Sequence, residues 1–389
     1  MRVLLLTPTY YPVIGGGEAH ARYLAEGLAR RNHNVSVVTD DLNLRLPAQE
    51  FNNGVEILRT QDYSDVIHRP DRVPWEEHVF GLLRQFELLL PKARIDIIHA
   101  HGLVSAILGA MMKNELQCKL VVSTHETQPA LEAMGRSRSD FIFGCVPYDL
   151  LIAGSRFFYE LAASFHAPRE RIRLIHYGVD TSHFHPGVER HRIRRALNLS
   201  MADRLVLLIG RFKTRKGMVE FVHAMAAVIS QEPTARALIS GTCHSASLEY
   251  LAEVERTMLA AGCQDRIVLR NQPWTYAEMP EVYAAADLVV QPSYAEGFGL
   301  ALLEAMAVGR PVIGSDVSGI REIIRDGETG WLVPPKDEIA LARAILKLLK
   351  DGDEARRLGD NGCRFVQTSL NSDRMVEETI AAYQRVLSA

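Results

Sequence analysis

The sequence predicts an α/β protein made of two doubly wound, parallel-sheet domains. Short runs rich in Val, Ile and Leu alternate along the chain with segments of helical periodicity, which is the pattern of βαβ units. Many of these runs are apolar throughout, as expected of strands that helices cover on both faces. At roughly 150 residues per domain, the 389 residues allow two or three domains, and the pattern restarts once. We therefore expect two domains of similar size.

The expected strands of the first domain are residues 3–6, 35–38, 55–58, 95–98, 120–122, 150–152 and 172–175. Those of the second domain are residues 205–209, 237–239, 267–269, 288–290, 312–313 and 330–333. Residues 180–198 combine proline, glycine and a charged run, which is typical of a linker. We therefore predict an N-terminal domain at 1–185 and a second domain at 186–370. Residues 371–389 have apolar positions at helical spacing, and we expect this helix to cross back to the N-terminal domain.

Composition and charge limit the classes of function. Hydrophobic residues make up 47% and charged residues 23%, as in globular proteins, and the net charge of −3 argues against a nucleic-acid partner. The five cysteines are far apart, so we expect neither disulfides nor a Cys-x-x-Cys site. No apolar run approaches the ~20 residues of a transmembrane helix, and the first one is too short for a signal peptide. We predict a cytoplasmic protein, and leave peripheral membrane contact and oligomeric state open.

The most informative motif is the glycine-rich turn that runs from Glu296 to Glu304. It follows the expected strand 288–290 and opens a helix, so it lies where ligands bind in open α/β sheets. The backbone N–H groups of the two glycines and of the helix N-terminus suit a phosphate group. Glu296 and Glu304 could accept hydrogen bonds from sugar hydroxyls, or serve only as a helix cap and a solvated charge.

A cationic loop follows the expected strand 205–209. Residues 210–217 read Gly-Arg-Phe-Lys-Thr-Arg-Lys-Gly, in which Arg211 offers a planar fork and Lys216 a point charge to phosphate oxygens. The loop lacks the Gly-Lys-Ser/Thr ending of a P-loop. A phosphate site and a solvated basic loop are the two interpretations that these residues allow.

Glycines and histidines occupy corresponding strand ends of the first domain. Residues 15–17 are three glycines before a helix, where they could meet an anion or form only a tight turn, and no Gly-x-Gly-x-x-Gly dinucleotide fingerprint follows. His99, His101 and His125 follow two further strands. They could bind zinc, be buried structural histidines or contact a ligand. We favour contacts to a ligand and predict no metal site.

Asp351 and Asp353 match the Asp-x-Asp metal signature of some sugar transferases. They lie between two charged helical segments, away from any strand end. We therefore expect a turn and a helix cap at this position rather than a metal site.

Together these segments resemble the retaining nucleotide-sugar glycosyltransferases of family 4, which have the GT-B fold of two Rossmann-like domains facing across a cleft. The resemblance spans most of the chain. It is most specific at residues 285–293, 296–300, 304–307, 309–312 and 327–330, and is supported by residues 15–17, 99–101 and 177–180. It implies a hexosyltransferase that moves a sugar from a nucleoside-diphosphate sugar to a hydroxyl of a small or glycan acceptor. It also implies retained anomeric configuration and no requirement for a metal or other cofactor.

The resemblance implies roles for individual residues. Arg211 and Lys216 would hold the donor diphosphate and stabilise the leaving nucleotide. Glu296 would bind hydroxyls of the transferred sugar, and His125 would contact that sugar near the reacting carbon. These four are the predicted catalytic residues. The predicted donor-binding residues are Gly16, Gly17, Arg211, Lys216, Arg270, Asn271, Glu296, Phe298, Gly299, Leu300 and Glu304, the last on the ribose.

The chain departs from the family pattern at two places. His176 and Tyr177 stand where the family usually has Pro-Asn before Gly-Val-Asp, and residues 241–244 replace Gly-x-Gly-Pro. The loop at Arg270 and Asn271 is expected to meet the nucleotide base without selecting it, and UDP is favoured as the commoner donor in the family. A sugar-like or natural-product acceptor is expected along residues 61–77 and 126–140.

Two other classes of function stay open. One is a sugar-nucleotide epimerase or a phosphorylase of the same fold, and the other is a non-catalytic sugar-nucleotide binder. A phosphorylase would need free phosphate as its acceptor, and an epimerase would release nucleotide without any acceptor. Product analysis therefore separates both from a transferase.

Overall fold

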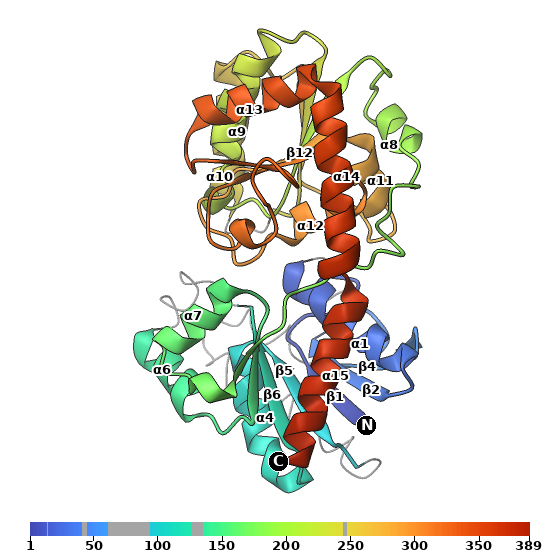
Figure 1. Ribbon diagram of the computed structural model, residues 1–389, viewed down its shortest axis with the longest axis vertical. Helices are drawn as coiled ribbons and strands as arrows, with labels where there is room; N and C mark the ends of the chain where they lie inside the picture. Colours follow the sequence, from blue (N-terminus) through green and yellow to red (C-terminus); the bar gives the residue numbers. More distant parts are fainter. Residues whose placement is uncertain (14, 41–44, 61–93, 126–134, 244–246) are drawn as a thin grey trace. The chain divides into compact units, whose positions relative to one another are not determined.

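The computed structural model describes residues 1–13, 15–40, 45–60, 94–125, 135–243 and 247–389, which form two compact units (Figure 1). Unit 1 comprises Met1–Gly178 and Ser372–Ala389, and unit 2 comprises Val179–Asn371. The chain thus divides after Gly178, whereas the sequence analysis placed the division after residue 185. The C-terminal residues from Ser372 onward belong to the first unit.

Unit 1 is built on an eight-stranded sheet of described residues in the order β3-β4-β2-β1-β5-β6-β7-β8. The pairings are parallel except that of β3 with β4. The strands are β1 (Arg2–Leu6), β2 (Asn34–Asp40), β3 (Gln49–Asn52), β4 (Val55–Thr60), β5 (Ile97–His101), β6 (Lys119–Thr124), β7 (Leu150–Ala153) and β8 (Ile172–Leu174).

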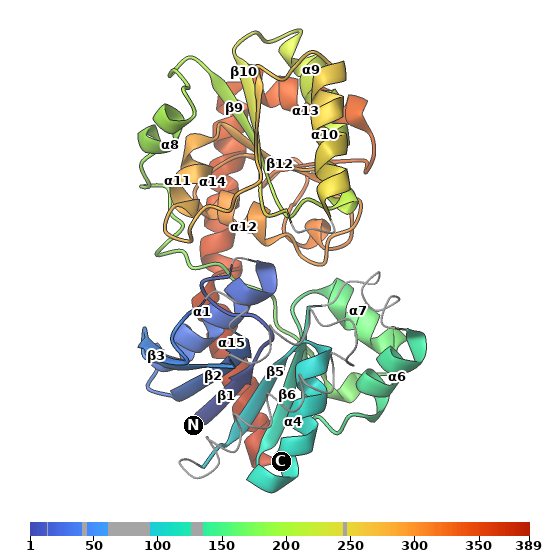
Figure 2. The same ribbon diagram turned by 180° about the vertical axis from the view of Figure 1, so that it is seen from behind.

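Helices cover both faces of this sheet. They are α1 (Gly16–Arg30), α4 (Leu103–Leu116), α6 (Arg136–Cys145), α7 (Arg156–Ser164) and α15 (Ser372–Ser388). α15 packs against α1 and reaches β6, whereas α4 packs on β5 and β6. Figures 1 and 2 show α15 and α4 on opposite faces of the sheet. This covering explains why the central strands are apolar throughout.

Unit 2 contains a six-stranded, fully parallel sheet of described residues in the order β11-β10-β9-β12-β13-β14. The strands are β9 (Arg204–Ile209), β10 (Ala235–Ser240), β11 (Ile267–Arg270), β12 (Leu288–Gln291), β13 (Val312–Ser315) and β14 (Trp331–Val333). The helices are α8 (His191–Ala196), α9 (Met218–Ile229), α10 (Leu248–Ala260), α11 (Met279–Ala285), α12 (Leu300–Ala307), α13 (Glu338–Lys350) and α14 (Gly352–Ser369). No helix in the described ranges is long and apolar enough to cross a membrane.

The predicted fold class, two α/β domains with parallel sheets, is confirmed. The antiparallel strand β3 was not predicted. Asn53 (φ 49°) and Gly54 (φ 80°) form the two-residue turn between β3 and β4. An Asn-Gly pair is a strong hairpin signal because both positions need positive φ. The signal was available, but the short and polar sequence Gln-Glu-Phe-Asn of β3 hid the strand itself.

Loops at the carboxyl end of the second sheet pack backbone against backbone. A Cβ atom at Gly241, which follows β10, would lie 1.8 Å from the carbonyl oxygen of Gly210, which follows β9. Gly217 has a φ of 67°, and a Cβ there would lie 2.2 Å from the carbonyl oxygen of Pro292. The loops after β9, β10 and β12 are therefore held together at one edge of the sheet, where the candidate site lies.

Candidate functional site

The loop after β9 gathers four cations. Lys216 ends a 3-10 turn (Thr214–Lys216) and is 9% exposed, whereas Arg211 and Lys213 are exposed. Neither Arg211 nor Lys213 forms a side-chain hydrogen bond or ion pair within the described residues. Partial desolvation lowers the pKa of Lys213, and the charges of Arg211, Arg215 and Lys216 lower it further. This uncompensated positive charge favours an anionic ligand.

Lys216 pairs with Glu296 from the loop after β12. Lys216 Nζ donates to Glu296 Oε2 at 2.5 Å, and Gln291 Nε2 donates to the same oxygen at 2.8 Å. Ser293 Oγ donates to it at 3.4 Å, and Arg215 Nη1 lies 3.7 Å away. The Glu296 side chain is 12% exposed. Three hydrogen bonds and the charge of Arg215 thus converge on Oε2, and the other carboxylate oxygen, Oε1, accepts none of these bonds.

The pair keeps Glu296 ionised. Burial by itself would raise the pKa of Glu296, but the charges of Lys216 and Arg215 and the hydrogen bonds to Lys216 and Ser293 bring it below its usual range. Burial lowers the pKa of Lys216, and the carboxylate of Glu296 opposes that effect. At neutral pH the site therefore presents a carboxylate held in one position, with an oxygen available to accept hydrogen bonds from hydroxyl groups.

The turn between Glu296 and α12 depends on glycine. Gly299 has a φ of 107° and immediately precedes the helix, which begins at Leu300, while Phe298 is buried. A Cβ at Gly319 would lie 2.3 Å from the carbonyl oxygen of Glu296, so the loop after β13 packs directly on this turn. α12 begins at the same sheet edge as the cationic loop. The N-terminus of a helix carries partial positive charge and favours anions.

Glu304 lies on α12 and is hydrogen bonded to Tyr283 of α11. Tyr283 Oη donates to Glu304 Oε2 at 2.7 Å, and Tyr283 is fully buried. Burial raises the pKa of Glu304 to about 7, although the bond from Tyr283 opposes the rise. Glu304 therefore titrates near neutral pH, and any further donor to its carboxylate favours the ionised form.

Arg270 ends β11 and stacks on Trp274. The guanidinium carbon lies 4.0 Å from the ring centroid, and Trp274 Nε1 donates to Ser240 Oγ at 2.9 Å. Arg270 Nε is buried without a hydrogen-bond partner in the part of the chain that the structure describes, and Asn271 is exposed. A guanidinium fixed on an indole presents a flat surface of the kind on which planar bases stack.

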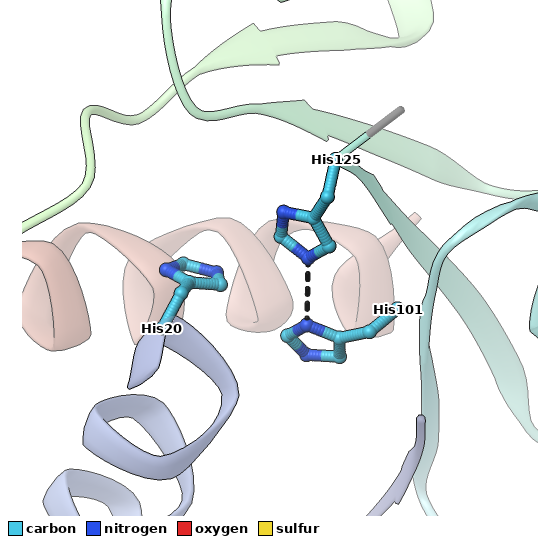
Figure 3. A group of neighbouring side chains, drawn as sticks. All are labelled: His20, His101 and His125. Carbon is cyan, nitrogen blue, oxygen red and sulfur yellow. Dashed lines mark hydrogen bonds between the residues drawn. The ribbon is translucent and has the colours of Figure 1, made fainter. Parts of the chain in front are cut away.

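In unit 1, His125 lies beside the glycine turn that opens α1. The Cβ position of Gly17 is 3.6 Å from His125 Cδ2, and Gly16 is exposed. His125 Nδ1 lies 2.6 Å from Tyr177 Oη, and its Nε2 lies 3.1 Å from Nδ1 of His101 (Figure 3). Tyr177, one of the two departures from the family pattern, thus contacts the predicted catalytic histidine.

The histidines that lie together are not the three that the sequence indicated, because His20 takes the place of His99 beside His101 and His125. His99 Nδ1 lies 2.6 Å from Tyr383 Oη of α15, and its Nε2 lies 2.8 Å from Ser123 Oγ. With both nitrogens engaged, His99 is a buried structural histidine. His20 of α1 was missed, although it stands three residues after Gly17 and therefore on the same helix face.

The predicted site residues fall into two groups. The group in unit 2 combines the carboxyl-end loops and α12, and consists of Arg211, Lys216, Arg270, Asn271, Glu296, Phe298, Gly299, Leu300 and Glu304. Within it Lys216 contacts Glu296. Arg270 ends β11 and Asn271 follows it, and β10 separates that strand from β9. The group in unit 1 consists of Gly16, Gly17 and His125.

Three other predictions concern the Asp-x-Asp motif, the cysteines and the acceptor segments. Asp351 caps α14 by accepting from the backbone N–H of Glu354 at 3.0 Å, so the expected helix cap is confirmed. The five cysteines are free, as expected. The acceptor segment 61–77 and most of 126–140 lie outside the described residues.

Comparison with known families decides the class of this chain. The model described as "Glycosyl transferases group 1" matches residues 189–365, which include the cationic loop and both glutamates. The model described as "Glycosyltransferase Family 4" matches residues 14–183, which include the glycine turn and His125. The chain is a family 4 glycosyltransferase. The predicted family and the predicted class of reaction, glycosyl transfer, are confirmed.

Relatives and solved structures agree with this class. The glycosyltransferase is 28% identical to the D-inositol 3-phosphate glycosyltransferase of Thermobispora bispora, with 98% of this chain and 94% of the relative covered. It is similar to the structure of sucrose-phosphate synthase from Thermosynechococcus elongatus, with a TM-score of 0.85, 26% identity, and 100% and 99% of the two chains covered. HepE from Anabaena, solved in complex with UDP and glucose, shares the fold. The TM-score is 0.78 and the sequence identity is 20%, with 99% of this chain and 100% of HepE covered.

Proposed function

We propose that this glycosyltransferase moves a hexose from a nucleoside-diphosphate sugar, with UDP favoured, to a hydroxyl of a small or glycan acceptor. We further propose that the anomeric configuration is retained and that no metal ion or other cofactor takes part. The observation that carries the proposal is the cationic loop after β9 beside the buried Lys216–Glu296 pair.

The charge of the loop supports transfer without a metal. Glycosyl transfer develops negative charge on the departing diphosphate, and fixed cations stabilise that charge most when they are already in place. Arg211 and Lys213 are exposed without partners in the described residues, and Lys216 is held by Glu296. We assign the diphosphate to Arg211 and Lys216, which supply the charge that a divalent ion would otherwise provide.

The remaining residues of unit 2 provide contacts to the rest of the donor. We assign Glu296 Oε1 and the N–H groups at Phe298, Gly299 and Leu300 to hydroxyls of the transferred sugar. Glu304 accepts from the ribose hydroxyls, because its carboxylate has a single hydrogen bond from Tyr283 and capacity for more. The base stacks on the Arg270–Trp274 surface, next to Asn271.

Retention is explained by attack on one face of the sugar. The bond between the anomeric carbon and the phosphate oxygen breaks, and the bond to the acceptor oxygen forms on the same face. The acceptor proton passes to the departing phosphate oxygen, so a separate general base is not required. We assign His125 to the transferred sugar, with Gly16 and Gly17 beside it on the donor.

The acceptor is a small polyol or glycan. Among the relatives, one is named for D-inositol 3-phosphate and another for sucrose phosphate, and both names describe small polyhydroxylated compounds. These names support a small polar acceptor rather than a lipid.

A nucleotide titration tests the proposal first. Unfolding of the full chain is followed with UDP, GDP, ADP and TDP, each with EDTA present. A nucleotide at a hundred times its Kd adds about 2.7 kcal/mol to the free energy of unfolding. We expect one nucleotide, UDP, to stabilise the protein, and its sugars to be transferred in EDTA with retained configuration in the product. Activity that is lost in EDTA and restored only by added metal would contradict metal independence. Release of free nucleotide without an acceptor would favour the epimerase.

A further inference from the structure

Three imidazoles from separate elements converge inside unit 1 (Figure 3). His20 comes from α1, His101 ends β5, and His125 directly follows β6. Each offers a ring nitrogen, and these three nitrogens all lie within 4.8 Å of one another. A helix, the last residue of one strand and the residue directly after the neighbouring strand therefore place the three side chains.

Hydrogen bonding within the protein does not satisfy this cluster. Neither ring nitrogen of His20 has a partner in the described ranges, and the same is true of His101 Nε2. His20 is 3% exposed and His101 is 2% exposed, so bulk solvent does not form hydrogen bonds with these ring nitrogens. A buried polar atom without a partner costs about 1–3 kcal/mol. The His20 ring has two such nitrogens, and it lies 5.4 Å from the ring of His101 and 5.3 Å from that of His125, which indicates a group bound among the three rings.

The chemistry of the cluster selects a transition-metal ion. Burial lowers the pKa of His20 and of His101, and neighbouring histidines lower both further, so the rings are neutral at pH 7. Neutral imidazole is the form that binds metal. Among the described residues the cluster consists of imidazoles alone, and such a set favours ions that prefer nitrogen ligands over Mg²⁺ and Ca²⁺.

Two distances fit such an ion. His101 Nδ1 and His125 Nε2 are 3.1 Å apart, and two nitrogens of a tetrahedral zinc site with Zn–N bonds of about 2.0–2.1 Å are separated by roughly 3.3 Å. His125 Nδ1 lies 2.6 Å from Tyr177 Oη. Metal-binding histidines usually hold a partner at the other ring nitrogen in this way, which fixes the ring orientation.

We propose that His20, His101 and His125 form a three-histidine site for Zn²⁺, with water as a fourth ligand, and that the bound ion inhibits glycosyl transfer. The binding part of this inference stands on unit 1 alone. The inhibition part rests on the proposed function, because the ion occupies the Nε2 nitrogen of the histidine that we assign to the transferred sugar. Transfer itself needs no metal, so removal of the ion by a chelator leaves the enzyme active.

Zinc binding is tested first on the full chain after EDTA treatment and removal of the chelator. Zn²⁺ is titrated against a chromogenic indicator, and we expect one ion per chain. His20→Gln should weaken binding at least about tenfold because one of three ligands is lost. His166→Gln is the matched control, since His166 is an exposed histidine of the same unit, and it should bind Zn²⁺ like the wild type. Equal affinity in His20→Gln and His166→Gln overturns the site.

A spectroscopic test on the wild type keeps the inference independent of variant folding. Co²⁺ in a tetrahedral nitrogen site absorbs visible light strongly, whereas octahedral Co²⁺ on the protein surface absorbs weakly. We expect the strong bands to appear and to vanish when Zn²⁺ is added. A spectrum that stays octahedral means that internal water satisfies the cluster and that no metal site exists.

Inhibition is measured separately, as the transfer rate with and without Zn²⁺. We expect Zn²⁺ to lower the rate, EDTA to restore it, and Mg²⁺ to have no effect. Binding without inhibition overturns the inhibitory role and argues against the proposed contact of His125 with the sugar. Nucleotide binding and transfer without any zinc binding overturn this inference and leave the proposed function intact.

Discussion

The assignment of Glu304 to the ribose predicts that donor binding releases a proton. This residue lies partly buried on α12, where within the described residues its carboxyl accepts one hydrogen bond, from Tyr283 at 2.7 Å, and desolvation raises its pKa to about 7. Hydroxyl donors from a bound ribose stabilise the carboxylate form and lower that pKa again. Nucleotide binding below pH 7 should therefore release a proton from Glu304.

The size of the effect follows from the pKa. A group with a pKa of about 7 is roughly 90% protonated at pH 6 and roughly 10% protonated at pH 8. Binding of the nucleotide diphosphate should release about 0.9 proton at pH 6 and about 0.1 at pH 8 if the carboxylate form alone binds. For the same reason the affinity of the wild type should rise about tenfold between these two pH values.

Calorimetric titration in buffers of different ionisation enthalpy measures this release directly. At pH 6 the apparent binding enthalpy should vary with the buffer in the wild type and in Glu328→Gln, a control at an exposed glutamate of the same unit. Glu304→Gln should bind more weakly and with little buffer dependence. Proton release that persists unchanged in Glu304→Gln, or no release at pH 6 in the wild type, would refute the assignment of Glu304 to the ribose.

The raised pKa of Glu304 also predicts how the free energy of unfolding depends on pH. An ordinary carboxylate in an ion pair stabilises the protein as pH rises, whereas Glu304 should have the opposite effect. The folded-state pKa of Glu304 lies above the unfolded value, so the unfolded chain loses this proton first as pH rises. Stability without nucleotide should fall between about pH 4.5 and pH 7, by roughly 3 kcal/mol in total. Glu304→Gln should remove that fall, as urea denaturation at several pH values would show.

Two further predictions concern the sheet edge that holds the site. Lys216→Met should lower kcat by about 10² or more through lost stabilisation of the leaving diphosphate. It should also destabilise unit 2 by about 3 kcal/mol in urea denaturation, because Glu296 stays buried with weaker partners, and adding Glu296→Gln should recover part of the loss. Wild-type turnover and stability in Lys216→Met would contradict the role of the pair. Gly241→Ala should cost about 1–3 kcal/mol because its Cβ meets the carbonyl oxygen of Gly210, whereas Gly352→Ala, with open space around its Cβ, should leave stability nearly unchanged in the same denaturation assay.

Local sequence signals predicted most of the strands because each strand has its own apolar run. The expected strand at residues 205–209 corresponds to β9 (Arg204–Ile209), and the one at 120–122 corresponds to the middle of β6 (Lys119–Thr124). β3 escaped because a short edge strand with polar side chains has no apolar run, although Asn53 and Gly54 marked its turn. Periodicity reports burial, and an edge strand is only partly buried.

The site was predictable where chemistry and chain position coincide. Arg211, Lys216 and Glu296 all follow strands of a parallel sheet, and the carboxyl ends of such strands share one edge. Long-range partners were not predictable in this way. Tyr283 on Glu304 and Tyr383 on His99 come from helices whose side-chain contacts no local pattern specifies.

The sequence by itself determined the fold class, the family and the loops that carry the site, because these depend on apolar periodicity and on residue types at strand ends. Tertiary structure alone decided the protonation and pairing of the side chains there. It decided that Glu296 is ionised by Lys216 while Glu304 titrates near neutrality, and that His20 rather than His99 joins His101 and His125. The physical reason is that desolvation and hydrogen bonding depend on what surrounds a group in space, and those neighbours come from distant parts of the chain.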